Sequence, residues 1–181
     1  MTPRLLPLRQ RGVTLAEMLV TVAVIALAAS IAVPNAGSSA VFAADAGASE
    51  VVSAIRFAQR EAVRTGAWHA VRFDVAEQSL LVYRLTSAGV QDNAKTVFHP
   101  IDKAGYAIRF GAMGKLAAAE FKFKTRPVTN TLSFRPDGVP ANINPSDLSV
   151  NLLELDGKVV LAQGGVQRSV AVARVTGRAA F

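Results

Sequence analysis

The chain has 181 residues, with 20 Lys and Arg against 13 Asp and Glu, which gives a formal net charge of +7. Hydrophobic residues make up 51% and charged residues 18%, a composition that excludes wholesale disorder and fits one domain with an appendage. The absence of cysteine excludes disulfides, thiol nucleophiles and cysteine-based metal sites. Because Arg4, Arg9 and Arg11 lie in the first dozen residues, the rest of the chain is only mildly basic.

An almost uninterrupted apolar stretch follows this basic segment, from residue 13 to residue 33. As a helix it would be about 31 Å long, which is close to the thickness of a bilayer's hydrocarbon core. A basic leader before an apolar run also describes a secretory signal peptide. Glu17 argues against that alternative, because a carboxylate inside an apolar run costs free energy in lipid and indicates a functional site.

A second helix is predicted from Ser49, as the amino-terminal cap, to Gly66, as the stop. Residues 35–48, rich in Gly, Ala and Ser, are interpreted as a loosened helix or a hinge. The helix carries two stripes, an apolar one predicted to face the core and a basic one interpreted as a solvated face, with phosphate binding as the alternative. The apolar stripe consists of Val51, Ile55, Ala58 and Ala62, and the basic stripe consists of Arg56, Arg60 and Arg64.

Alternating apolar residues after Gly66 predict an antiparallel sheet. Residues 68–75 and 79–85 form the first predicted hairpin, and a second hairpin is predicted at Asp156 and Gly157. Gly164 and Gly165 indicate a turn between strands. The other predicted strands are residues 96–101, 106–110, 120–123 and 168–178, with a further strand through Leu132 and Phe134.

The string RQRGVTLAEMLVTVAVIALAASIAVPN resembles the class III signal of type IV prepilins and type II secretion pseudopilins. The resemblance implies that a prepilin peptidase cleaves between Gly12 and Val13 and that the new amino group of Val13 is methylated. It also implies that Glu17 acts in filament assembly and that Pro34 kinks the helix. Val13 departs from the larger residue that most of the family has at this position.

The resemblance implies an α+β, pilin-like fold, in which a long amino-terminal transmembrane helix continues into an antiparallel β-sheet domain. The expected parts are a leader at 1–12, a transmembrane and assembly helix at 13–34, a hinge and outer helix half at 35–66, and a periplasmic β domain at 67–181. The basic leader favours a cytoplasmic amino terminus, so we expect a single-pass protein of the bacterial inner membrane. The expected partners are the prepilin peptidase, other pilins or pseudopilins, and the membrane.

The carboxyl-terminal half resembles, more loosely, the H-type minor pseudopilins of type II secretion and the FimT/FimU-like minor pilins of type IV pili. We therefore expect a minor pseudopilin, a structural subunit in protein export across the outer membrane, with a minor pilin in pilus assembly or DNA uptake as the alternative. Some DNA-uptake pilins carry a Gly-Arg-x-Arg motif near the carboxyl end. Here Gly177 and Arg178 are followed by two alanines, so DNA contact by Arg174 and Arg178 is the less favoured interpretation.

No pattern in the sequence predicts catalysis, a cofactor or a metal site, so the chain is not expected to be an enzyme. His69 and His99 lie on different predicted strands, where His69 is expected at the strand surface and His99 in a structural position. Asp74 and Glu77 flank a predicted turn, where acidic residues are common.

Overall fold

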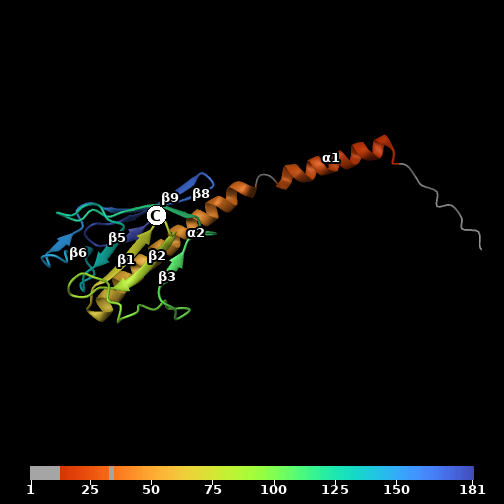
Figure 1. Cartoon of the computed structure of the whole chain (residues 1–181). Coiled ribbons are helices and arrows are strands. Elements are labelled where there is room, and N and C mark those ends of the chain that lie inside the picture. The colour runs from red at the N-terminus through yellow and green to blue at the C-terminus, as the bar shows by residue number, and fades with distance from the viewer. Residues whose placement is uncertain (1–12, 33–34) are drawn as a thin grey trace, which may run out of the picture. The chain divides into compact units, whose positions relative to one another are not determined.

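The computed structural model of the chain describes residues 13–32 and 35–181. The chain divides into two compact units, Met1–Ser38 and Ser39–Phe181. Helix α1 (Leu15–Ala32) belongs to the first unit, and helix α2 (Asn35–Thr65) begins in the first unit and continues into the second (Figure 1).

Residues 35–48 are helical, so α2 begins well before the predicted cap, and the assignment of Ser49 as that cap is wrong. Two properties of this segment explain the longer helix. Alanine has the highest helix propensity, and every fourth residue of the segment faces the domain core, with Ala40 9% exposed and Ala44 and Ala48 fully buried. The small-residue composition that suggested a hinge is the composition of a closely packed helix face.

The end of α2 is as predicted. The helix stops at Thr65, and Gly66 follows with a φ of +63°, a left-handed conformation that ends helices and that glycine adopts without steric cost. The Thr65 hydroxyl donates a hydrogen bond of 2.7 Å to the carbonyl oxygen of Glu61.

The first sheet has the strand order β3-β2-β1-β5, and each neighbouring pair is antiparallel. The predicted hairpin is confirmed, because β1 pairs with β2 in a register that joins Asp74 to Ser79 and His69 to Arg84. The four strands are β1 (His69–Asp74), β2 (Ser79–Arg84), β3 (Ala107–Arg109) and β5 (Thr131–Phe134).

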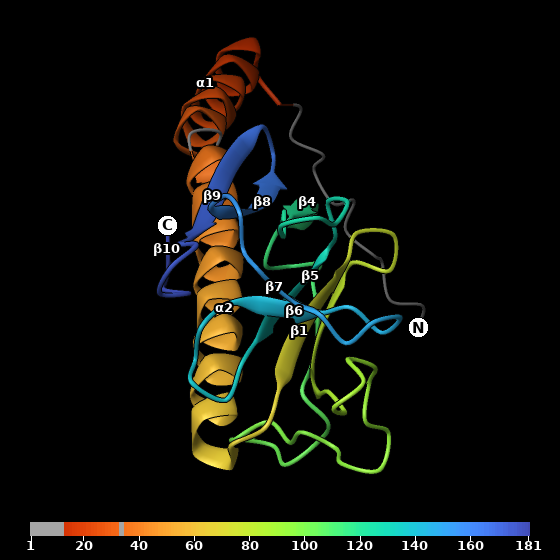
Figure 2. The ribbon, with the colours of Figure 1, turned by 90° about the vertical axis from the view of Figure 1, so that its left-hand side faces the viewer.

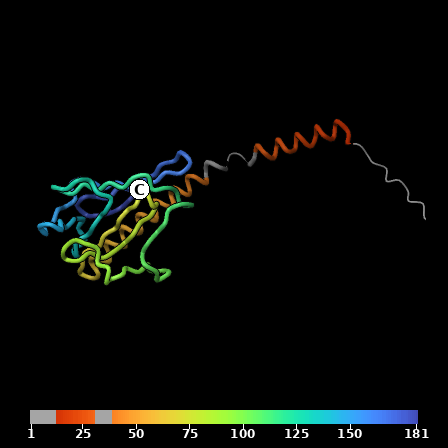
Figure 3. Tube along the Cα trace, in the orientation of Figure 1, coloured from red at the N-terminus to blue at the C-terminus, as the bar shows by residue number. Residues whose placement is uncertain are grey.

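A second four-stranded sheet has the order β10-β9-β8-β4, and a separate two-stranded sheet pairs β6 with β7. Figure 2 shows α2 running along one side of these sheets, and the trace in Figure 3 follows the chain through them. The strands are β4 (Lys115–Glu120), β6 (Ala141–Ile143), β7 (Val150–Leu152), β8 (Gly157–Gln163), β9 (Val166–Val172) and β10 (Ala179–Ala180).

Several short strand predictions are displaced. Residues 96–101 form no strand and contribute only one bridge, between Phe98 and Gly105. The strand predicted at 120–123 lies earlier, as β4, and it ends where the predicted strand begins. Phe121 and Phe123 are buried and take part in isolated bridges, so their side chains produced the alternating pattern without a continuous ladder.

The hairpin predicted at Asp156 and Gly157 is wrong. A two-residue hairpin turn of this kind needs positive φ at its central residues, and neither residue has it. Gly157 instead begins β8 beneath the Phe121 ring, where a Cβ would lie 2.5 Å from Phe121 Cδ1. The turn with positive φ is the predicted one at Gly164 and Gly165, at +53° and +83°, and it joins β8 to β9.

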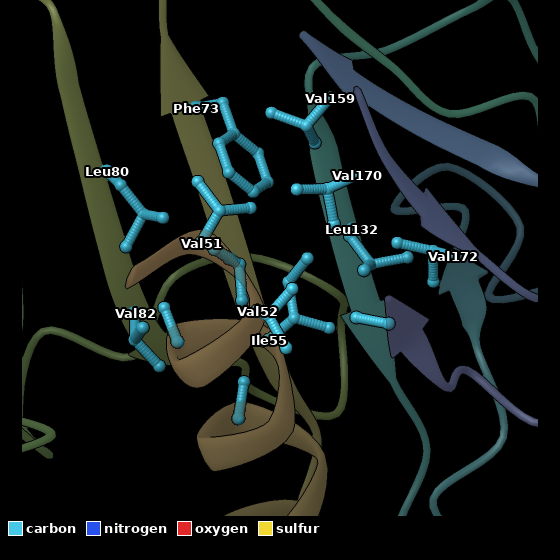
Figure 4. Close-up of a cluster of buried hydrophobic side chains, with 14 of the residues drawn as sticks. Val51, Val52, Ile55, Phe73, Leu80, Val82, Leu132, Val159, Val170 and Val172 are labelled. Atoms are coloured by element: carbon cyan, nitrogen blue, oxygen red, sulfur yellow. The ribbon is translucent and has the colours of Figure 1, made fainter. Parts of the chain in front are cut away.

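The core of the second unit lies between α2 and the sheets. The apolar stripe of α2 is fully buried, as predicted, and it packs in one cluster with Phe73 of β1 and Phe134 of β5. Figure 4 shows Val51, Val52 and Ile55 of the helix beside side chains of both four-stranded sheets, among them Leu80 and Val170. One helix face therefore holds the two sheets together.

Replacing Ile55 with aspartate should place an unpaired carboxylate in this core. We expect a loss of at least about 3 kcal/mol in the free energy of unfolding, because an isolated charge cannot be solvated there. Ser53→Asp is the matched control, because Ser53 is exposed on the same helix. Thermal unfolding of the full-length chain in a non-ionic detergent measures both variants, and equal midpoints would contradict the assigned core face.

Candidate functional site

The predicted assembly residues lie at the start of α1. The backbone N–H of Glu17 donates to the Thr14 carbonyl oxygen at 3.1 Å and to the Thr14 hydroxyl at 3.2 Å. Thr14 is therefore the amino-terminal cap of α1, and Glu17 is the third helical residue, in the spacing of a capping box. A carboxylate in the first turn is also stabilised by the helix dipole.

The surface of α1 is apolar around most of its circumference. At 100° per residue, its large side chains cover all but a sector of about 100°, and that sector holds Glu17, Thr21 and alanines. They are between 58% and 80% exposed, and they are Leu15, Met18, Leu19, Val20, Val22, Val24, Ile25 and Leu27. A helix of this kind is stable in a protein only where lipid or other helices surround it.

Glu17 is the one charged residue of α1. The two hydroxyls described in the helix are satisfied internally, because Thr21 donates to the Met18 carbonyl and Ser30 to the Leu27 carbonyl, each at 2.8 Å. The Glu17 carboxylate, in contrast, makes no hydrogen bond or ion pair with any described residue. Among the described residues, α1 thus presents one carboxylate without a partner on an otherwise uncharged helix.

Two of the predicted site residues, Gly12 and Pro34, lie outside the described residues. Val13 is described, and its side chain is 63% exposed. Within residues 13–32 and 35–181, no helix meets the combined criteria of length and apolarity for crossing a membrane.

The basic stripe of α2 is exposed, but two of its three members are engaged within the domain. Arg56 donates to the carbonyl oxygen of Ala179 at 3.0 Å, and Arg64 forms a bidentate ion pair with Glu61. These contacts fit the interpretation of a solvated, structural face.

Arg174 and Arg178 are exposed on the loop between β9 and β10. The loop is closed by two backbone bonds, from Ala173 to the Arg178 carbonyl and from Gly177 to the Ala173 carbonyl. Gly177 has a φ of +68°, and a Cβ there would lie 2.6 Å from Phe134 Cε1. The fold therefore leaves no room for a side chain at this position. The guanidinium of Arg174 donates to the carbonyl oxygen of Glu154 at 3.3 Å.

The acidic residues and histidines considered for catalysis do not come together in one site. The Asp74 carboxylate accepts a hydrogen bond of 2.9 Å from the Glu77 backbone N–H, which closes the β1–β2 turn. His99 lies 3.3 Å from Asp102 and packs edge-on against the Tyr106 ring. No group of three or more His, Cys, Asp or Glu side chains in the described parts of the chain is placed to hold a metal ion.

His69 contradicts the expectation of a surface residue, because its side chain is only 2% exposed. It begins β1 beside the end of α2, and its Nδ1–H donates to the Ala67 carbonyl oxygen at 3.0 Å. Burial lowers the pKa of His69, and the Ala67 hydrogen bond and the charge of Glu61 oppose this effect only in part. The alternation places His69 on the same face of β1 as the buried Val71 and Phe73, so its position in the strand indicated burial and its polarity misled the prediction.

Because the pKa of His69 is lower in the folded chain than in the unfolded chain, stability should be complete above about pH 6.5 and fall as the pH drops below it. We expect the free energy of unfolding to decrease between about pH 7.5 and pH 5.5, and to decrease less in His69→Gln. Denaturant unfolding at both pH values provides the measurement. An equal decrease in the variant would show that another group causes it.

One comparison with known proteins concerns the amino-terminal segment. Residues 7–33 match the family model described as the prokaryotic N-terminal methylation motif. This match confirms the resemblance of the amino-terminal segment to prepilins. A sequence comparison with curated proteins finds no significant match.

Two solved structures are similar in fold. The minor pseudopilin EpsH from the type 2 secretion system of Vibrio cholerae is 15% identical, with a TM-score of 0.45 over 72% of this chain and 89% of that chain. The type IV minor pilin FimU of Pseudomonas aeruginosa strain PAO1 is 17% identical, with a TM-score of 0.41 over 76% of this chain and 87% of that chain.

Proposed function

We propose that the chain is a minor pseudopilin, a structural subunit of a type II secretion pseudopilus, and that it has no enzymatic role. The alternative within the same class is a FimT/FimU-like minor pilin that acts in pilus assembly or DNA uptake. The observation that carries the proposal is the helix that bears the methylation motif, which is apolar around most of its circumference and carries one unpaired carboxylate. The apolar surface of such a helix is buried only where other molecules surround it.

The proposed location follows from the same helix. Before assembly, residues 13–34 lie in the inner membrane, with the basic leader in the cytoplasm and the β domain in the periplasm. The large apolar side chains of α1, each more than half exposed, support lipid as the first surrounding medium. Prepilin peptidase then cleaves between Gly12 and Val13 and leaves the helix attached, and the new amino group is methylated.

In this proposal, Glu17 directs the docking of subunits. Cleavage creates a cationic amine on Val13, and an unpaired carboxylate and an unpaired ammonium are each unfavourable in an apolar medium. When a new helix joins the filament, the amine of one subunit pairs with the Glu17 carboxylate of its neighbour. The pairing fixes the axial position of the helices, which their largely apolar surface leaves undefined.

Glu17→Ala and Glu17→Gln should leave cleavage, membrane insertion and domain folding intact but reduce incorporation into the filament. Insertion should be at least as efficient as in the wild type, because the unpaired charge is removed. Thr21→Ala is the matched control, since the Thr21 hydroxyl bonds only within its own helix. Co-purification of each variant with the other filament subunits, with processing followed in parallel, makes the comparison. Wild-type incorporation of both Glu17 variants would contradict the proposed pairing.

Deletion of the gene separates the two alternatives within the class. If the chain is a pseudopilin, its deletion is expected to abolish the export of proteins across the outer membrane while surface pili remain. If it is a minor pilin, its deletion is expected to reduce pili or DNA uptake while export continues. In the second case, replacing Arg174 and Arg178 tests their role in DNA contact, because phosphate contacts weaken as salt is raised.

A further inference from the structure

A cavity of about 530 Å³ lies at the carboxyl-terminal end of α2, the end opposite Asn35. The end of α2, the start of β1, the end of β2 and the loop that follows β2 all contribute to its lining. Figure 2 shows this loop beside the last turn of α2. The cavity belongs wholly to the Ser39–Phe181 unit and includes none of the residues of the assembly segment.

The lining of this cavity is strongly basic. Arg64, Arg84, Lys95 and Lys103 contribute four cationic side chains, and Glu61 contributes the one carboxylate. Glu61 is already paired with Arg64, so it compensates only one of the four charges. The cavity therefore has an excess of positive charge inside a concave surface, where the field of several charges adds.

Two of these cations are free to bind an anion, and a third, Arg84, forms only one long ion pair, with Asp92. Lys95 and Lys103 are exposed, and neither side chain pairs with a carboxylate among the described residues. Arg84 Nε is buried and donates no hydrogen bond to any described residue, and the nearest carboxylate oxygen, that of Asp92, is 3.8 Å away. The described residues therefore leave part of the hydrogen-bonding capacity of the Arg84 guanidinium unused.

One side of the cavity is apolar. Phe57, Val97, Phe98 and Pro100 line it, and Phe98 is 58% exposed. The domain therefore leaves more than half of the Phe98 surface uncovered. This surface suits a ligand that presents an apolar group next to its negative charge.

We propose that this cavity, which we name the basic pocket, binds an acidic peptide segment of a partner protein that carries an apolar side chain beside its carboxylates. The charge of the pocket is complementary to such a segment, and its volume lies in the range of about 300–1,000 Å³ that is typical of ligand sites. Nucleic acid fits less well, because its phosphates are contacted along an extended surface and not at a single pocket.

The binding test uses the full-length chain in a non-ionic detergent and the capped tetrapeptide Glu-Phe-Glu-Asp, measured by isothermal titration calorimetry. The matched peptide Gln-Phe-Gln-Asn keeps the apolar group and removes the charges. We expect binding of the acidic peptide that weakens as NaCl is raised, and no detectable binding of the amide peptide. Absence of acidic-peptide binding, or equal binding of the two peptides, would overturn the proposal.

The variant Lys95→Ala/Lys103→Ala locates the binding site. We expect it to lower the affinity for the acidic peptide about tenfold, because two partly exposed ion pairs are lost. Lys158→Ala removes an exposed lysine of β8 outside the pocket and should bind like the wild type. Wild-type affinity in the double variant would overturn the proposal.

Two further measurements distinguish peptide binding by the basic pocket from nucleic-acid binding and from filament assembly. A single-stranded oligonucleotide that bound more tightly than the peptide, and lost its binding in the double variant, would replace the peptide with nucleic acid as the ligand. Glu17→Gln should bind the acidic peptide like the wild type, because α1 contributes nothing to the pocket. A failure of the pocket proposal is thereby distinguishable from a failure of the assembly proposal.

Discussion

The burial of one face of α2 against both four-stranded sheets is the interaction on which the domain depends. The buried face extends from Ala40 through Ala44 and Ala48 to Ala62, and small side chains along it let the sheets approach the helix backbone closely. At Gly47 a Cβ would lie 2.2 Å from the carbonyl oxygen of Met113, in the turn before β4, so only glycine fits there. The domain therefore begins near Ser39, because a shorter helix would lose part of this face.

Helix α1 presents the opposite situation. α2 has one apolar face, and the chain supplies the sheets that cover it, whereas α1 is apolar around most of its circumference. Glu17, in the first turn after the Thr14 cap, gives the amino-terminal end of α1 a charge that the rest of the helix lacks. The physical division between a helix that builds the domain and a helix that needs other molecules is the basis of the proposed function.

Local patterns predicted the parts of the structure that local forces determine. The buried stripe around Ile55, the stop at Gly66 and the turn at Gly164 and Gly165 follow from spacing and backbone conformation alone. The hairpin at Asp156 and Gly157 failed because contact with Phe121, distant in sequence, requires that glycine. The basic pocket was missed for the same reason, since Lys95 and Lys103 meet the end of α2 only through the tertiary fold.

The central claim is that the apolar helix stays in the mature protein and serves assembly. The most direct test is the mass of the mature chain isolated from the membranes of its own bacterium. The account predicts a chain that begins at Val13 and is heavier than the unmodified sequence by one methyl group. A chain that begins after the apolar run, near Ile31, would identify a removed signal peptide and contradict the account.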